Sequence, residues 1–555
     1  MRIGREGFLR RSFSVVPEDF CRLYQNDELR LNIEFLEEAA GARVFLHTNI
    51  DCPKNKWREI EFSRGMDGYH LSCPVRQCGN YQFKLKYSLA NGKTWYWDRA
   101  PFSRVIVDPE YIKDIRMYTL IPSVSGTIRD WIALLPGIAD LGFNTLHLLP
   151  LTSRDNTESP YAACDLFSID RAYTGNEQDS AFSLFGTFTE KAREIGIRLC
   201  FDLVLNHIGT GSKMVRMCPE WIVPDKTEKD GFKRSGCWHM NAWLKWEDLV
   251  KIYYDHPHPD IRNDIWDYMK KYALFWSYFA DLTGGMVRLD NLHSSHEGFI
   301  TELLEALRQT YPNLAVTAEF FTDSNTILKK AAQWQINLFL ANQWEYPYAE
   351  NLRNYIAYIH DIGTKVRFYL PITTHDTGAP AQLFGKAEAA VPRYAVTALM
   401  GTGQTGIVQG TEHGYPEKIN FMGRRAPCRF STNAWIAERI GAINRLLRSS
   451  PIFHEAGNLD WIDNRHGAVL GALRRPNRRG DRGFLIFANL DIRNPYYFFI
   501  HLSTLIPGRP FLRMEDCIDG TGFETKSDHM QIHVGPCDIR VFAVGKPDTI
   551  PDHSD

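Results

Sequence analysis

Several features that would assign the chain to a specialised class are absent from its 555 residues. No apolar run approaches the roughly 18 residues that a membrane-spanning helix needs, so we expect no membrane partner. Lys and Arg (64) nearly balance Asp and Glu (66), and the resulting net charge of −2 offers no basic surface for nucleic acid. This balance is compatible with a neutral substrate.

A cysteine framework and an export signal are missing as well. The eleven cysteines form an odd count with no regular spacing and no CxxC pair, which indicates free thiols in a reducing compartment. The basic N-terminus runs into Pro17, Glu18 and Asp19 instead of an apolar segment, so it does not resemble a signal peptide. We therefore expect a cytoplasmic protein.

Residues 1–112 have the pattern of an all-β module, and we predict an N-terminal β-sandwich there. Apolar residues alternate with polar ones, the period of a half-buried strand, at Leu29, Leu31, Ile33 and Phe35. Asn91-Gly92 indicates a tight hairpin with Trp95 and Trp97 on the return strand. These tryptophans either stack on sugar rings or form the hairpin's own cross-strand pairs.

Residues 113–450 alternate between strand and helix patterns, which predicts a (β/α)8 TIM barrel of the α/β class. The predicted strands cover residues 117–122, 143–151, 197–207, 285–290, 314–319, 337–342, 366–372 and 405–410. The predicted helices include residues 127–141, 181–195, 263–282, 297–311 and 432–449. The segment 208–262 is too long for a plain loop and should form a subdomain inserted after the third strand. Short strands return over residues 451–545, which predicts a C-terminal β-sandwich.

Four short segments carry polar residues at or near the ends of predicted barrel strands: DLVLNH (202–207), GMVRLDN (285–291), TAEF (317–320) and TTHD (373–376). Parallel barrel strands deliver such residues to one mouth. Three separate carboxylates, Asp290, Glu319 and Asp376, suit the cleavage of glycosidic bonds, which needs one carboxylate to attack and one carboxylic acid to protonate the leaving oxygen. A single such aspartate would more often be a helix cap; the ordered set favours a catalytic site.

In this order the four segments resemble those of the α-amylase superfamily, glycoside hydrolase family 13. The resemblance implies that Asp290 is the nucleophile, that Glu319 is the acid/base, and that Asp376 holds sugar hydroxyls and stabilises the transition state. Arg288 lies two residues before Asp290, on the same side of the strand, where a cation would keep the nucleophile ionised. Glu319 must keep its proton near neutral pH, which nearby anions would favour.

The same resemblance implies further substrate-binding residues. His207 and His375 would donate hydrogen bonds to the sugar, and Tyr161, in SPYAACDLFSIDRAYTG (159–175), would stack on it. Asp202 and Asn206 match structural residues of the first segment. His293 and Ser294 replace the Lys-His pair that contacts the acceptor in ordinary α-amylases, where the His also provides a backbone ligand to calcium. We therefore expect no metal site and no cofactor.

Residues 288–322 resemble most the glucanotransferase part of glycogen debranching enzymes. The leading interpretation is a 4-α-glucanotransferase that acts on α-1,4-glucans or maltooligosaccharides. The alternatives are an α-amylase-type hydrolase, a maltosyltransferase that uses maltose 1-phosphate, and, in another class, a non-catalytic glucan-binding protein. No second, all-helical catalytic domain is evident in the sequence, so we expect any 1,6-glucosidase of the pathway to be a separate protein. Trp221, Trp238, Trp243 and Trp246 crowd the insert and either roof the site or form the core of the subdomain.

Overall fold

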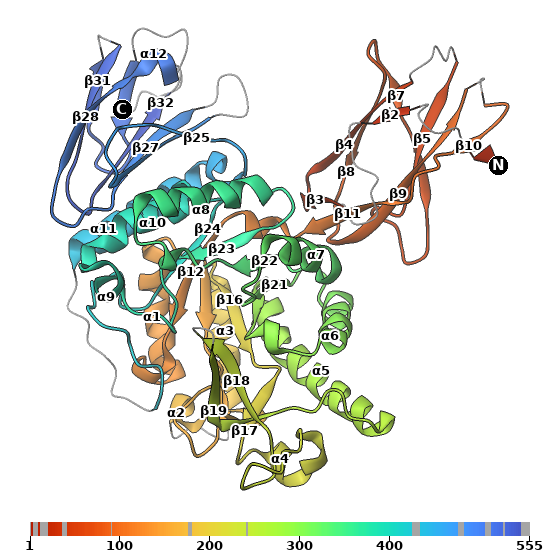
Figure 1. Cartoon of the computed structure of the whole chain (residues 1–555), viewed down its shortest axis with the longest axis vertical. Coiled ribbons are helices and arrows are strands. Elements are labelled where there is room, and N and C mark those ends of the chain that lie inside the picture. The colour runs from red at the N-terminus through yellow and green to blue at the C-terminus, as the bar shows by residue number, and fades with distance from the viewer. Residues whose placement is uncertain are drawn as a thin grey trace.

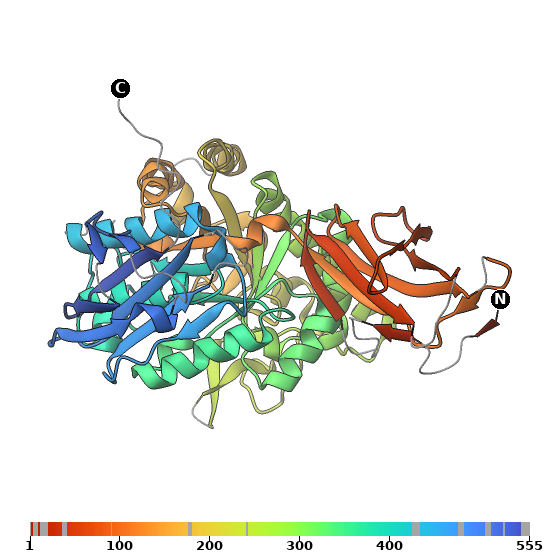
Figure 2. The ribbon, with the colours of Figure 1, turned by 90° about the horizontal axis from the view of Figure 1, so that it is seen from above.

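The computed structural model describes residues 2–3, 9–11, 20–35, 41–89, 92–175, 180–239, 242–423, 433–475, 482–505, 512–525 and 528–544. In Figure 1 a central barrel carries one β-rich domain at each upper side and a small inserted sheet below. Figure 2 shows the two β-rich domains at opposite ends of the barrel.

The N-terminal domain is a β-sandwich of two sheets. One sheet contains β1 (Arg2–Ile3), β10 (Tyr96–Trp97), β9 (Gly79–Ser88), β11 (Ser103–Asp108), β3 (Phe20–Tyr24), β5 (Arg43–Thr48) and β6 (Arg58–Glu61). The other contains β2 (Leu9–Arg11), β4 (Glu28–Phe35), β8 (Tyr69–Pro74) and β7 (Ser63–Arg64). The predicted alternation holds in β4, where Leu29, Leu31 and Ile33 are buried between the sheets.

Eight parallel strands close the central barrel. They are β12 (Ile115–Leu120), β13 (Thr145–Leu148), β16 (Arg198–Leu203), β20 (Met286–Leu289), β21 (Ala315–Ala318), β22 (Leu338–Leu340), β23 (Phe368–Pro371) and β24 (Gln404–Val408). The main helices around them are α1 (Ile128–Asp140), α3 (Ala181–Glu194), α5 (Pro259–Leu282), α6 (Glu297–Thr310), α7 (Ser324–Trp334), α8 (Ala349–Ile362), α10 (Ala390–Leu399) and α11 (Ala434–Ser449). The predicted (β/α)8 architecture is confirmed. Three of these helices, α7, α8 and α10, were not predicted from the sequence.

One strand prediction is wrong in its second half. The strand expected over 197–207 ends at Leu203, because the chain then leaves the barrel. His207 instead begins β17 (His207–Gly209), which pairs with β19 (Ala242–Lys251) in a small sheet that also contains β18 (Arg234–His239). This sheet, with the short helix α4 (Lys213–Met217), forms the inserted subdomain. A hairpin of β14 (Thr152–Arg154) and β15 (Ala163–Ile169) follows the second barrel strand.

The C-terminal domain also consists of β-sheets. Its larger sheet has the order β25 (Leu459–Trp461), β26 (Val469–Arg474), β27 (Gly483–Asn489), β32 (Ile539–Val544), β29 (Leu512–Asp516) and β30 (Gly522–Thr525). The strands β28 (Tyr496–His501) and β31 (His529–Val534) form the facing pair. The side chain of Arg474 is buried and donates hydrogen bonds to the carbonyls of Leu399 (3.0 Å) and Phe453 (2.9 Å), which fixes this domain to the barrel helices.

The N-terminal domain is attached to the barrel at the N-terminal ends of the barrel strands. Asp108 accepts hydrogen bonds from Arg22 Nε (2.6 Å) and from Asn337 Nδ2 (2.8 Å), and Asn337 lies just before β22. Arg22 also donates to the carbonyl of Lys365 (3.1 Å), before β23. The barrel mouth, at the carboxyl ends of the strands, lies on the side of the barrel opposite this interface, beside the insert.

Among the described residues no helix is long and apolar enough to cross a membrane.

Candidate active site

At the mouth, one arginine joins three carboxylates that come from three neighbouring strands. Arg288 of β20 is paired in register with Asp202 of β16, and Asp290 and Glu319 follow β20 and β21 directly. Arg288 Nη1 lies 2.8 and 2.6 Å from the two oxygens of Asp202 and 3.1 Å from Asp290 Oδ1. Its Nη2 lies 2.8 Å from Glu319 Oε2. These four residues form the arginine cluster, which contains the predicted nucleophile Asp290 and the predicted acid/base Glu319.

The cluster is nearly closed to solvent, so its charges interact strongly. Arg288 and His147 hold the pKa of the Asp202 carboxyl well below its usual range, against the opposing effect of burial. Burial raises the pKa of Asp290 well above its usual range, and the Glu319 and Asp202 carboxylates raise it further, whereas Arg288 lowers it. One cation thus faces three carboxylates, and at Asp290 burial and the neighbouring carboxylates outweigh Arg288, so the pKa of Asp290 is raised.

Arg288 also contacts a carboxylate that the sequence did not connect with it. The sequence connected Arg288 with Asp290, and in the structure its shortest contact, 2.6 Å, is to Asp202 Oδ2. The cause is the barrel register, which places Asp202 opposite Arg288 on the adjacent strand. Asp202 therefore competes with Asp290 for the guanidinium.

The acid/base candidate Glu319 accepts a second hydrogen bond, besides that from Arg288, from the segment that follows β20. The backbone N–H of Asn291 donates to Glu319 Oε2 (3.0 Å), the same oxygen that accepts from Arg288. Asn291 adopts the left-handed conformation (φ 43°, ψ 48°), which is uncommon for a residue with a side chain. The strained backbone directly after Asp290 thus turns an amide toward the second carboxylate.

Tyr161 and His375 form one wall of the site. The Tyr161 hydroxyl lies 3.0 Å from Asp202 Oδ2 and 2.6 Å from His375 Nε2, and the two rings are nearly parallel at 7° with centroids 5.8 Å apart. Burial lowers the pKa of His375 well below its usual value. The neutral ring remains available for hydrogen bonding to a sugar.

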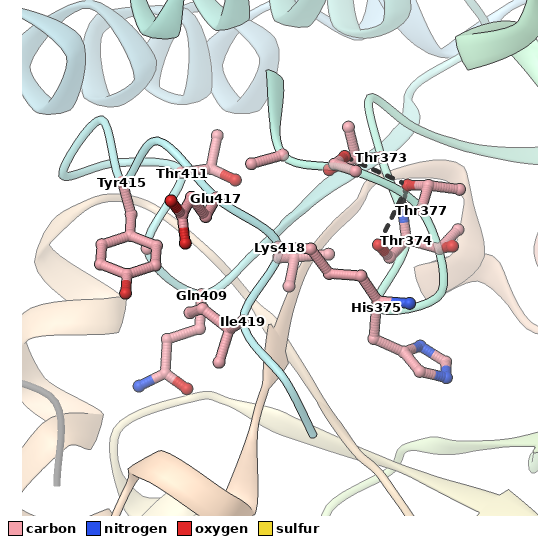
Figure 3. Close-up of a pocket in the computed structure, with 14 residues that line it drawn as sticks. Thr373, Thr374, His375, Thr377, Gln409, Thr411, Tyr415, Glu417, Lys418 and Ile419 are labelled. Carbon is pink, nitrogen blue, oxygen red and sulfur yellow. Dashed lines mark hydrogen bonds between the residues drawn. The ribbon is translucent and has the colours of Figure 1, made fainter. Parts of the chain in front are cut away.

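The third predicted acid, Asp376, lies in a turn after the seventh barrel strand. The strand β23 ends at Pro371, and Asp376 belongs to the turn that follows. In this turn the Thr377 hydroxyl accepts a hydrogen bond from the Thr374 N–H (2.9 Å) and donates one to the Thr374 carbonyl (3.1 Å; Figure 3). Its side chain is 52% exposed, and Oδ2 lies 3.1 Å from His375 Nε2. Figure 3 also shows the small pocket that this turn forms with the segment after β24, from which Lys418 donates to the Asp376 carbonyl (2.7 Å).

His207 and Asn206 occupy the border between barrel and insert. Asn206 Nδ2 donates to the Asn291 carbonyl (3.0 Å), and its oxygen contacts His207 Nδ1. Burial lowers the pKa of the His207 imidazole to about 3. His207 Nε2 is buried and has no hydrogen-bond partner among the described residues. The predicted acceptor residue His293, on the short 3₁₀ helix Leu292–Ser294, is exposed.

Of the tryptophans in the insert, one borders the site and another belongs to the core of the subdomain. Trp246 lies edge-on to His207 (ring centroids 5.5 Å apart) and so borders the site. Trp221 packs against Tyr268 of α5 and belongs to the subdomain core. Trp243 is 47% exposed, and the side chain of Trp238 lies outside the described part of the structure.

Comparison with known proteins agrees with this fold. A sequence model of the glucanotransferase domain of glycogen debranching enzyme matches residues 111–227. The α-1,4-glucan:maltose-1-phosphate maltosyltransferase of Chlorobaculum tepidum is 22% identical over 77% of this chain and 67% of its own length. The corresponding enzyme of Bifidobacterium longum is 23% identical over 82% of this chain and 62% of its own length. The chain thus spans about two thirds of these relatives.

Solved structures support the same fold. An α-amylase from Geobacillus thermoleovorans superposes with a TM-score of 0.63 at 14% identity, covering 79% of this chain and 99% of its own. A debranching enzyme from Nostoc punctiforme superposes with a TM-score of 0.60 at 15% identity over the same shares. In sequence and in fold the chain resembles the α-amylase superfamily, glycoside hydrolase family 13. It is an enzyme of the glycosidase and glucanotransferase class.

One neighbour of this site was not predicted from the sequence. His147 of β13 lies with Nε2 3.5 Å from Asp202 Oδ2, and its Nδ1 is 3.2 Å from the Thr119 hydroxyl. A histidine inside the otherwise apolar run LHLLPL (146–151) was the available signal. Asn291 was missed because its only signal was the general tendency of Asn to adopt left-handed backbone conformations, which does not by itself mark a site. Within the described residues no group of three or more His, Cys, Asp or Glu side chains is placed to hold a metal ion.

Proposed function

We propose that the chain is a retaining α-glucan transferase. Asp290 attacks the anomeric carbon of the donor sugar while Glu319 gives its proton to the departing oxygen, which leaves a glycosyl ester on Asp290. Glu319 then takes the proton from an acceptor sugar hydroxyl, whose oxygen displaces Asp290 from the anomeric carbon. Asp376 and the histidines His207 and His375 hold the hydroxyls of the reacting sugar.

The observation that carries this proposal is the shared guanidinium of Arg288. Both carboxylates bond to its two amino nitrogens (3.1 and 2.8 Å), so they lie a few ångströms apart on one side of the mouth. That arrangement suits a retaining enzyme, whose carboxyl groups stand about 5–5.5 Å apart, better than an inverting one, in which a water must fit between them.

Two donors are candidates for the transfer. The relatives named as maltosyltransferases align with most of the chain, which favours maltosyl transfer from maltose 1-phosphate with phosphate as the leaving group. The match to the debranching-enzyme domain favours transfer between α-1,4-glucans. The first candidate rests on the longer alignment and takes precedence over the 4-α-glucanotransferase that the sequence motifs suggested.

Product analysis distinguishes the reactions. The protein is incubated with maltoheptaose alone, and with maltoheptaose and maltose 1-phosphate. We expect chains lengthened by maltosyl units and release of inorganic phosphate only in the second mixture. Longer and shorter products from maltoheptaose alone, with a constant number of reducing ends, would instead indicate 4-α-glucanotransfer. Shorter products with a matching rise in reducing ends would refute the transferase and indicate a hydrolase.

A further inference from the structure

A second concave site lies beside the mouth, between the segment that follows β21 and the helix α8. Its cavity volume is about 480 Å³. One wall is the segment Phe320–Ser324, which directly follows Glu319, and the other is the outer face of α8. None of the groups assigned above to the reaction lines it, so the catalytic mechanism does not account for this groove.

The wall contributed by α8 has an unusual composition for a helix face. Asn351, Asn354, Tyr355 and Tyr358 recur at the spacing i, i+3, i+4 and i+7, which brings them onto one stripe. The core-facing stripe of the same helix is apolar and includes Leu352, Ile356 and Ile359. The groove-facing stripe therefore presents amides and phenols instead of either a core surface or a charged solvent face.

The aromatic rings of the groove are held in place by their neighbours. Tyr346 and Tyr355 lie with ring centroids 4.7 Å apart, and the Tyr355 hydroxyl donates to Asn342 Oδ1 (2.9 Å). The Tyr358 hydroxyl accepts from Ser324 Oγ (3.1 Å). A rigid ring surface can bind an apolar sugar face without a large loss of side-chain entropy.

The polar groups of the groove select for an uncharged ligand. The amides of Asn351 and Asn354 are exposed and make no hydrogen bond to other described residues; each offers both a donor and an acceptor. The described side chains that line the groove include Asp323 but no Lys or Arg. A phosphorylated ligand would find no cation there, whereas a polyhydroxylated sugar chain finds rings and amides.

The groove is also connected to the mouth. Phe321, which is 41% exposed, makes an edge contact with Trp344 (centroids 6.2 Å apart), and Trp344 packs against the apolar interior of the barrel. Aromatic side chains thus extend from Glu319 toward α8. We propose that this groove binds several glucose units of an α-glucan chain whose end reacts in the catalytic site. This inference rests on the proposed function and identifies the neutral glucan, not the phosphorylated donor, as the ligand of the groove.

The test uses the full chain and soluble amylose as the probe. In the double variant Asn351→Ala/Asn354→Ala, the dissociation constant for amylose, measured by affinity electrophoresis, should rise about tenfold for the loss of hydrogen bonds of ordinary strength. The exposed helical Asn263 provides the matched control, and Asn263→Ala should bind amylose like the wild type. Turnover of maltotriose as acceptor should change less than about twofold, because a short chain does not reach the groove.

A second pair of variants tests the rings. Tyr346→Ala should weaken amylose binding, and Tyr346→Phe, which keeps the ring, should restore it. Unchanged amylose affinity in the double variant and in Tyr346→Ala would overturn the proposal, as would displacement of amylose from the groove by maltose 1-phosphate in the Asp290→Asn protein. If the wild type binds amylose through these residues but transfers nothing, the proposed function fails and the groove assignment stands. If glucan transfer occurs and the variants bind amylose like the wild type, the proposed function stands and the groove assignment fails.

Discussion

Replacement of Arg288 by methionine tests the electrostatic account of the site most directly. The substitution keeps much of the side-chain volume and removes the cation shared by Asp202, Asp290 and Glu319. The side chain of Asp202 is fully buried and that of Arg288 is 8% exposed, so solvent cannot replace the lost charge. Loss of one partner of such a buried pair destabilises a protein by about 3–5 kcal/mol.

The effect should depend on pH with a defined sign. In the wild type the folded-state pKa of Asp202 is depressed, so this group contributes stability above its unfolded pKa and loses it as pH falls through the folded pKa. Without Arg288, burial raises that pKa instead, and protonation relieves the penalty. The difference in unfolding free energy between variant and wild type should therefore shrink as pH falls from 7 toward 4.

Differential scanning calorimetry of the barrel transition provides the assay. We expect the midpoint of Arg288→Met to fall by roughly 10 °C at pH 7. Arg193, exposed on α3, is the control, and Arg193→Met should change the unfolding free energy by less than about 0.5 kcal/mol. Addition of Asp202→Asn to Arg288→Met should recover most of the loss, because both charges are then absent. An Arg288→Met protein with wild-type stability at pH 7, or no recovery in the double variant, would refute the reasoning.

Three further predictions concern catalysis, pH and metal. Asp290→Asn and Glu319→Gln should each lower kcat by several orders of magnitude with the circular dichroism spectrum unchanged, and a folded Asp290→Asn protein with near-native turnover would contradict the assignment. Because burial lowers the pKa of His207 to about 3, the unfolding free energy of the wild type should decrease as pH falls from about 6.5 toward 3. His207→Gln should reduce the slope of unfolding free energy against pH by up to about 1.4 kcal/mol per pH unit. Equal slopes in the two proteins would show that His207 is not the titrating group. Activity should survive a chelator, since the described residues offer no cage of the six to eight oxygen ligands that calcium takes; loss of activity that calcium alone restores would show the opposite.

Local patterns were sufficient for the barrel strands and for the carboxylates that follow them. Strand periodicity depends on neighbouring residues, and a carboxylate placed directly after a parallel strand reaches the mouth whatever the remainder of the chain does. Asp290 and Glu319 were therefore placed correctly beside each other. His207 was misplaced relative to its strand, because strand ends are set by pairing partners: β16 stops at Leu203, and His207 pairs with β19 of the insert.

By itself the sequence determined which residues have the chemistry of a glycosidase and the order in which they reach the mouth. Only the tertiary structure decided how those charges are shared. Arg288 and Asp202 are 86 positions apart, and they meet because β16 and β20 are neighbours in the closed barrel. The groove beside α8 likewise depends on the packing of segments whose separate sequences show no common pattern. Contacts of this kind follow from the closure of the barrel, which no local stretch of sequence encodes.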